Sequence, residues 1–205
     1  MAQQILRDFL MLLVTIDPIG AVALFVPLTA SLSDAERTRT AWKAAFIAAI
    51  VLLAFLVAGE FLLAELGIRL VSFQVAGGIV LFLFGLQMVF GTGAVAERST
   101  AEAGHDIAVF PLALPGIASP GAIMAVVLLT DNHRQSIAQQ AVTAAVLLVV
   151  IAITVVALLA SRHVIRLLGI TGANVIIRVM GLLLTALATE QVALGLESLF
   201  NRRAG

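Results

Sequence analysis

Cysteine and tyrosine are both absent from this 205-residue chain, and tryptophan occurs once, at Trp42. Without cysteine, the chain has no disulfide bond, no thiolate metal site and no dithiol redox relay. Charged residues make up only 12% of the sequence, whereas a soluble domain typically has about 25%. The formal net charge is zero, so composition gives no sign of a nucleic-acid partner. The chain is instead 61% hydrophobic, which predicts an integral membrane protein in contact with membrane lipid.

Six apolar runs approach the roughly 20 residues that a helix needs to cross a bilayer core. These runs are Phe9–Leu28, Ala44–Ala64, Phe73–Val89, Ile107–Thr130, Ala141–Ala160 and Gly172–Leu194. We expect the polar segments between them to be loops, among them Thr29–Lys43, Gly91–Asp106 and Ser161–Thr171. The runs are too long for barrel strands and lack their alternation. The sequence therefore predicts an all-α protein with six transmembrane helices, forming one membrane domain over residues 1–205.

Proline and glycine mark an internal repeat. All five prolines lie in the first and fourth runs, which contain Asp17-Pro18-Ile19-Gly20 and Ser119-Pro120-Gly121. Proline interrupts the hydrogen-bond ladder of a helix, so we expect helices 1 and 4 to be broken at Asp17-Pro18 and Ser119-Pro120. Leu66-Gly67-Ile68 and Leu168-Gly169-Ile170 precede the third and sixth runs. We predict two inverted three-helix repeats, at about 1–95 and 105–200, because an odd number of helices per half turns the second half over in the membrane.

The two breaks are the candidate binding site. Aspartate and serine are favoured helix N-caps, and proline is favoured directly after the cap, so each break can start a half-helix whose positive end lies within the membrane. Such ends suit a small anionic group. We expect the substrate to contact Asp17, Pro18, Ile19, Gly20, Ser119, Pro120 and Gly121. Asp17 has two possible roles: its carboxylate binds a coupling proton or Na⁺, or it serves only as a helix cap. For Ser119, we expect a role as a helix cap.

Other polar residues within the apolar runs are few. Candidates for coupling or gating, besides Asp17, are Gln74, Arg178 and Glu190. The three histidines fall in loops, so we expect no metal site and no cofactor. An enzyme is not expected, because no histidine lies at membrane depth to act as a base and we expect no second buried aspartate.

These residues resemble a known family. Asp17-Pro18-Ile19-Gly20 followed by Phe25-Val26-Pro27-Leu28-Thr29 is similar to the first-helix motif of the MarC family of bacterial inner-membrane proteins. Pro111-Leu112-Ala113-Leu114-Pro115 followed by Ser119-Pro120-Gly121-Ala122-Ile123 is similar to its fourth-helix motif. Two departures are Ser119, where the family usually has glycine, and Gln74, where it often has arginine. The resemblance implies a multi-pass protein related to small neutral amino acid transporters and to the lysine-exporter-like superfamily.

The breaks, the repeat and the resemblance together predict a secondary transporter of small neutral amino acids or similar zwitterions. A passive channel with paired half-helix ends and an exporter of drugs or metabolites remain as alternatives. A homo-oligomer is also left open. Basic residues are split almost evenly between the two sides, and the cluster Arg37–Lys43 favours both termini in the periplasm.

Overall fold

The computed structural model describes residues 2–90, 106–131 and 135–201, and every regular element among them is helical. The elements are α1 (Ala2–Ile16), α2 (Pro18–Leu28), α3 (Asp34–Glu65), α4 (Leu70–Phe90), η1 (Ala108–Ile117), α6 (Pro120–Leu129), α7 (Ile137–Leu159) and α8 (Ser161–Asn201). The prediction of an all-α protein is thus confirmed for the described residues. Five helical spans are long and apolar enough to cross a membrane, or six if the bent pair of η1 and α6 counts as one.

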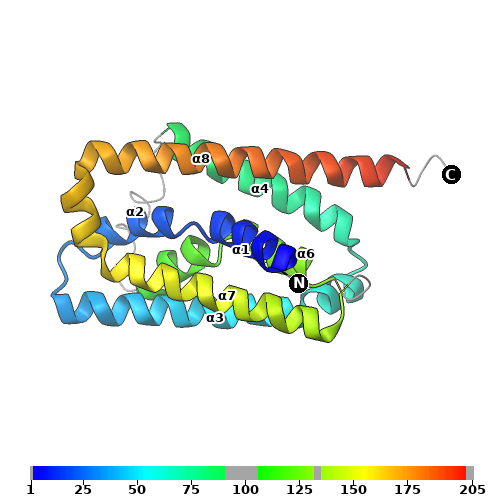
Figure 1. Ribbon diagram of the computed structural model, residues 1–205, viewed down its shortest axis with the longest axis horizontal. Coiled ribbons are helices and arrows are strands. Elements are labelled where there is room, and N and C mark those ends of the chain that lie inside the picture. The colour runs from blue at the N-terminus through cyan, green and yellow to red at the C-terminus, as the bar shows by residue number, and fades with distance from the viewer. Residues whose placement is uncertain (1, 91–105, 132–134, 202–205) are drawn as a thin grey trace.

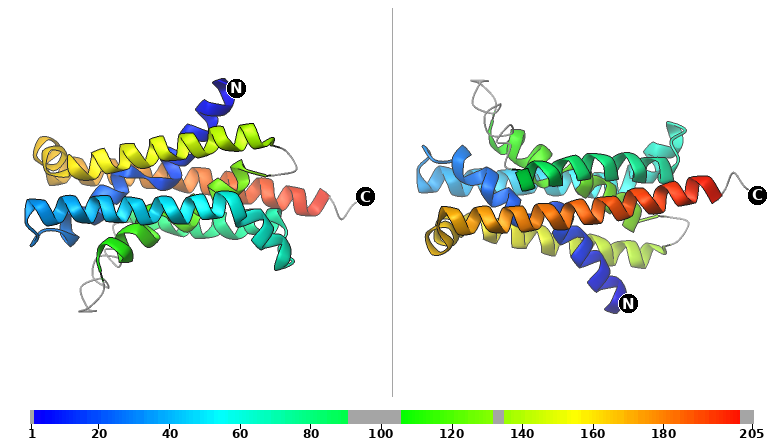
Figure 2. Two further views of the ribbon diagram at one scale, coloured as in Figure 1. Left: turned by 90° about the horizontal axis from the view of Figure 1, so that it is seen from below. Right: turned by 90° about the horizontal axis from the view of Figure 1, so that it is seen from above.

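The spans form three layers (Figure 1). The pair α4 and α8 lies on one side, the pair α3 and α7 lies on the other, and α1–α2 and η1–α6 lie between them. Successive spans run in opposite directions, and α1 crosses the bundle obliquely (Figure 2). The main core is therefore built around the two middle spans, and it includes Leu12 and Ile16 of α1 and Ile117 of η1.

Glycines bring α4 and α8 into close contact. A Cβ atom on Gly85 would lie 2.9 Å from the carbonyl oxygen of Gly181, and one on Gly181 would lie 2.8 Å from that of Gly85. A Cβ atom on Gly78 would lie 2.7 Å from Val192. Because only small residues let two helix backbones approach so closely, these glycines allow the direct packing of α4 against α8.

Two segments predicted as loops contain helix. The polar stretch 29–43 becomes helical at Asp34, because Ser33 and Glu36 form a capping box in which each accepts from the other's backbone N–H. Ser161–Thr171 is helical throughout as the first part of α8, which lies crosswise to the rest of that helix (Figure 1). Hydropathy indicates where the chain leaves the apolar core of a membrane, but a helix can continue beyond that point. The expectation of loops over all of 29–43 and Ser161–Thr171 was therefore wrong.

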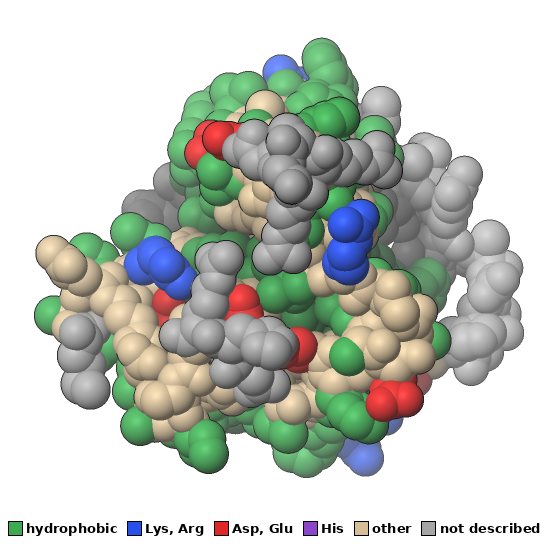
Figure 3. All heavy atoms as spheres, turned by 90° about the vertical axis from the view of Figure 1, so that its right-hand side faces the viewer, with side chains coloured by type: hydrophobic (Ala, Val, Ile, Leu, Met, Phe, Trp, Pro, Cys, Tyr) green, Lys and Arg blue, Asp and Glu red, His purple; other side chains and the backbone are tan. Residues whose placement is uncertain are grey.

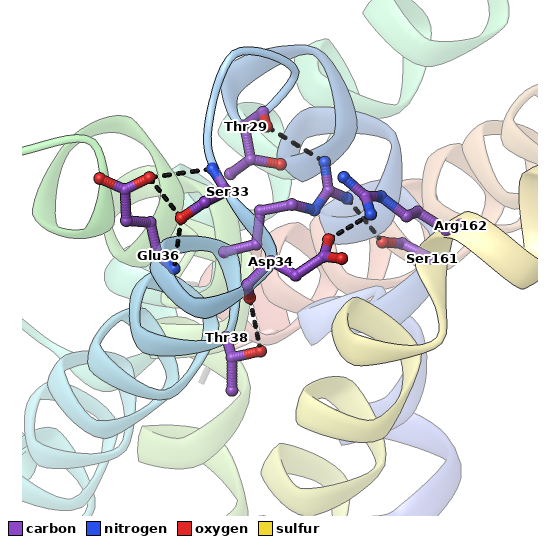
Figure 4. A network of polar contacts seen from close by, with 8 residues as sticks. Thr29, Ser33, Asp34, Glu36, Thr38, Ser161 and Arg162 are labelled. Atoms are coloured by element: carbon purple, nitrogen blue, oxygen red, sulfur yellow. Dashed lines mark hydrogen bonds and ion pairs between the residues drawn. The ribbon is translucent and has the colours of Figure 1, made fainter.

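A polar network closes the end of the molecule where α2 ends and α3 and α8 begin (Figure 4). Arg37 is buried there and donates to the carbonyl oxygen of Thr29 at 3.1 Å and to Ser161 Oγ at 3.2 Å. Its guanidinium lies 5.1 Å from the centre of the Phe25 ring, and Arg162 pairs with Asp34. The planar, always charged guanidinium can hold all these partners at once, so Arg37 ties three elements together.

A second ion pair lies outside the spans. Lys43 of α3 bonds Asp106, which precedes η1. The Lys43 ammonium holds the pKa of the Asp106 carboxyl below its usual range, with a further contribution from the Ala108 N–H. The pair therefore fixes the start of η1 against α3 at neutral pH.

Candidate functional site

Asp17 separates α1 from α2 and is only 2% exposed. Its backbone is left-handed, with φ 51°, and its Oδ1 accepts a hydrogen bond from the Gly20 N–H at 3.0 Å. The predicted N-cap role is thus confirmed. Its second oxygen, Oδ2, has no hydrogen-bond partner among the described residues. A Cβ atom on residue 20 would lie 2.1 Å from Oδ2, so only glycine leaves room for this carboxylate.

Ser119 occupies the matching place before α6, which follows η1 after a bend of 53°. Its hydroxyl accepts from the Ala122 N–H at 3.0 Å and donates to the carbonyl oxygen of Thr15 at 3.1 Å. The predicted cap at Ser119 is confirmed, and the same hydroxyl joins the two interrupted spans. Residues 104 positions apart in the chain therefore meet at the centre of the molecule.

A cavity of about 500 Å³ opens beside this junction. Asp17 and Gly20 line it from one span, and Ser119, Pro120 and Gly121 line it from the other. The remaining wall is largely apolar and comes from the rest of α2, from α4, from η1 and from Ile177 of α8. Among the described residues that line it, Asp17 is the one with a charged side chain, and Gln87 and Ser119 are the neutral polar ones. We refer to this space as the break cavity.

Not every predicted contact residue reaches the break cavity. Pro18 is buried but does not line the cavity, and Ile19 is 39% exposed and lies outside it. Gln74 donates to Gln191 Oε1 at 2.8 Å, away from both breaks. Arg178 and Glu190 are exposed on α8 and are not part of the lining. Of the coupling candidates, only Asp17 therefore lies at the break.

A second space opens at the end of the molecule that holds the N-terminus and the end of α8. A polar cavity of about 1040 Å³ lies there, and its walls carry Arg7, Glu60, Arg69 and Asp131. Figure 3 shows this end hollowed, with acidic and basic side chains near the opening. A neighbouring cavity of about 610 Å³ shares Arg7 and Gln74 with it and extends along α1 to Val14. We call these two connected spaces the polar cavity.

A hydrophobic cluster lies between the polar cavity and the break cavity. It consists of Leu81, Met124, Leu184 and Ala188, with partly buried neighbours packed against it. Leu81 also lines the break cavity, whereas Leu128 and Leu187, which pack on the cluster, line the polar cavity. Each cavity therefore ends on one side of the same apolar barrier.

One expectation about aspartate was wrong. We predicted no second buried aspartate, but Asp8 is 0% exposed and Asp131 is 9% exposed. Asp8 directly precedes the first apolar run, where hydropathy predicts the polar end of a span. Its burial depends on the oblique path of α1 against α7, which hydropathy does not report. Gln87 is also missing from the predicted site, because its position on the wall depends on helix packing.

No group of three or more histidine, cysteine, aspartate or glutamate side chains able to hold a metal ion occurs within residues 2–90, 106–131 and 135–201. His105 and His133 lie outside the described residues, and His163 is exposed at the start of α8.

Comparison with known proteins gives a consistent result. Residues 2–200 match the family described as MarC family integral membrane protein. A UPF0056 membrane protein of Methanocaldococcus jannaschii is 36% identical over 186 residues, covering 89% of this chain and 90% of the relative. The UPF0056 inner membrane protein YhgN of Escherichia coli K12 is 32% identical over 194 residues, covering 95% and 96%. No solved structure matches. Two interrupted apolar spans, several further membrane-length helices and a family match over nearly the whole length lead to one conclusion: the chain belongs to the MarC family of integral membrane proteins.

Proposed function

We propose that this protein is a secondary transporter of small neutral amino acids or similar small zwitterions, with the substrate held in the break cavity. It would act by alternating access in the inner membrane of a bacterium, with both termini in the periplasm. The relative YhgN is named an inner membrane protein, which agrees with this location. The observation that carries the proposal is the difference in charge between the two breaks.

The two breaks differ because their caps differ. At α2, the cap is the Asp17 carboxylate, which offsets the positive end of the helix and whose Oδ2 has no hydrogen-bond partner among the described residues. At α6, the cap is the neutral Ser119 hydroxyl, so the positive end beside Gly121 is not offset. An ammonium group suits the first end, and a carboxylate suits the second. A zwitterion with both groups and a short apolar side chain complements this cavity.

The arrangement of the spans supports alternating access. The first spans of the two predicted repeats contact each other, as do the second spans α3 and α7 and the third spans α4 and α8. Corresponding spans run in opposite directions (Figure 1), as inverted repeats require. The break cavity and the polar cavity lie on the two sides of the Leu81 cluster. A rearrangement of that barrier would therefore change the side of the protein to which the bound substrate has access.

Uptake into proteoliposomes tests the proposal. Labelled glycine and alanine are offered with and without a proton or Na⁺ gradient, and folded state is verified by size-exclusion chromatography. We expect saturable uptake that follows one gradient and is competed by other small amino acids. Absence of uptake under every gradient, with the protein folded, would refute a transporter of small amino acids.

A passive channel is the other class of function to test. Osmotic swelling of the same proteoliposomes with small neutral solutes would reveal it, because flux through a channel does not saturate and ignores coupling gradients. The apolar barrier between the two cavities favours the transporter. Outward flux from preloaded vesicles distinguishes an exporter from an importer.

A further inference from the structure

Asp8 of α1 is a second buried carboxylate, about nine residues and thus about 13 Å along the helix from Asp17. Its Oδ2 lies 2.7 Å from the hydroxyl oxygen of Thr143 on α7. Its Oδ1 has no hydrogen-bond partner among the described residues. A buried carboxylate oxygen without a hydrogen-bond partner is costly, so the surroundings of Asp8 Oδ1 need an explanation.

The surroundings of Asp8 contain more acceptors than donors. The Thr143 hydroxyl has one proton, yet it lies within hydrogen-bond distance of both Asp8 Oδ2 and the carbonyl oxygen of Gln139, at 3.2 Å. The Gln4 amide also reaches that carbonyl, but at 3.4 Å. Neither donor serves Asp8 Oδ1. One small cation would supply the missing positive charge.

Among the described residues, Arg7 is the cation that lies within ion-pair distance of Asp8, and it does not fill this role. Arg7 Nε lies 3.7 Å from Asp8 Oδ1, which is too long for a hydrogen bond, and the Arg7 side chain is 64% exposed. No charged residue occurs in α6 or α7, and the α8 residues that border the cavity beside α1 are Leu183, Leu187, Gln191 and Leu194. Among the described residues, the other charged groups in the walls of the polar cavity are Asp131, Glu60 and Arg69.

The site lies next to a route from outside. Gln4, Arg7 and Gln139 line the polar cavity. Arg7 Nε lies near Asp8 Oδ1, and the Gln139 carbonyl oxygen accepts from both the Gln4 amide and the Thr143 hydroxyl. A cation could therefore reach Asp8 from the polar cavity without crossing the Leu81 barrier. The Asp17 carboxylate lines the cavity on the other side of that barrier.

We propose that Asp8, Thr143 Oγ1 and the carbonyl oxygen of Gln139 form a site for one small monovalent cation, either a proton or Na⁺, that drives transport. A proton would reside on Asp8 Oδ2, which would donate to Thr143 Oγ1 while that hydroxyl donates to Gln139. Na⁺ would instead be bound by the oxygen atoms of these three residues. The driving role rests on the proposed function; the cation site itself does not.

Binding is measured first, on the full-length protein in detergent. Thermal unfolding is followed across a series of NaCl concentrations against matched choline chloride, and infrared spectroscopy follows the C=O stretch of a protonated carboxyl group. For Na⁺, we expect the wild-type midpoint to rise with NaCl and that of Asp8→Asn to stay constant. For a proton, we expect a carboxyl band that is missing in Asp8→Asn and shifted in Thr143→Val.

Matched variants keep the test decisive. Asparagine adds donors to a site rich in acceptors, so Asp8→Asn should remain folded. Thr154→Val is the control for Thr143→Val, since Thr154 is also fully buried on α7 but bonds the Val150 carbonyl oxygen of its own helix. Thr154→Val should respond to cations as the wild type does. If Asp8→Asn and the wild type give the same Na⁺ response and the same carboxyl band, the site is refuted.

Transport then tests the driving role. If the wild type is active, the rate of gradient-driven uptake by Asp8→Asn should be at least tenfold lower than that of the wild type. Exchange of labelled for unlabelled substrate should persist in Asp8→Asn, because exchange needs no net movement of the driving ion. Unchanged dependence on the gradient in Asp8→Asn would overturn the driving role. An inactive wild type that still shows the Asp8 cation response would refute the proposed transport and leave the site standing.

Discussion

At the scale of single residues, the two caps at the breaks differ in more than charge. Asp17 Oδ1 accepts from the Gly20 N–H and Oδ2 has no partner among the described residues, whereas the Ser119 hydroxyl both donates and accepts a hydrogen bond. After capping its helix, Asp17 therefore still has one carboxylate oxygen that could bond a ligand, whereas the Ser119 proton is already donated within the protein. This difference decides which residue to mutate first.

Asp17→Asn should weaken binding of glycine or alanine by about 10–100-fold, the loss of one charge-assisted hydrogen bond of about 1.5–3 kcal/mol. Asparagine can still cap α2 and tolerates the left-handed backbone, so the fold should persist. Isothermal titration calorimetry measures the affinity, and Asp34→Asn at the surface is the control. Binding of normal strength would remove Asp17 from the site.

Gly121 and Leu81 should be energetically coupled. A Cβ atom on Gly121 would lie 2.3 Å from Leu81 Cδ1, and its three nearest neighbours all belong to that side chain. Gly121→Ala should destabilise the protein by about 1–3 kcal/mol through overpacking. In the double variant with Leu81→Ala, the loss should be smaller than the sum by about 0.5–3 kcal/mol. Unfolding in detergent provides the four values, and additive losses would contradict the contact.

At the scale of elements, helix pairs are held by different means. The close packing of α4 against α8 depends on glycines, which have no side chain to keep the two backbones apart. The junction of α2, α3 and α8 instead depends on the hydrogen bonds of Arg37. Close backbone approach cannot adjust by rotating a side chain, because the atoms in the way belong to the backbone. We therefore expect the α4–α8 contact to tolerate substitutions less well than the Arg37 junction does.

Gly85→Ala should lower the free energy of unfolding by about 1–3 kcal/mol, because the new methyl group meets the backbone of Gly181 and Thr185 at 2.9 Å. Ile79→Ala on the same helix is the control: Ile79 is 48% exposed to the surroundings of the bundle, and we expect a smaller loss. Unfolding by a denaturing detergent compares the two. Equal effects would show that the glycine contact does not hold the pair.

At the scale of the whole molecule, the barrier between the two cavities predicts that each cavity is accessible to solutes from a different side of the membrane. Ala23 lines the break cavity and Gln191 lines the polar cavity. In vesicles of known orientation, Ala23→Cys and Gln191→Cys should react with a membrane-impermeant thiol reagent from opposite sides. The chain has no cysteine of its own, so labelling is free of background. Labelling of both positions from one side would contradict the barrier at Leu81.

Local properties of the protein follow from the amino-acid sequence without knowledge of its packing. Long apolar runs require helices in a membrane, because lipid offers no partner to backbone groups. Asp-Pro and Ser-Pro dictated helix caps at Asp17 and Ser119, since capping depends on neighbouring residues only. The Ser33–Glu36 capping box was also readable in the sequence, and the polar composition of 29–43 concealed it.

Which polar groups are buried, and which groups they face, depends on how the helices pack against one another. Asp8 precedes the first predicted run, yet the oblique path of α1 places it against Thr143, 135 residues away. Arg178 and Glu190 lie within a predicted span, yet both face outward from α8. Burial depends on the rotation and tilt of each helix against its neighbours, and an apolar sequence with little amphipathic pattern does not encode these angles locally.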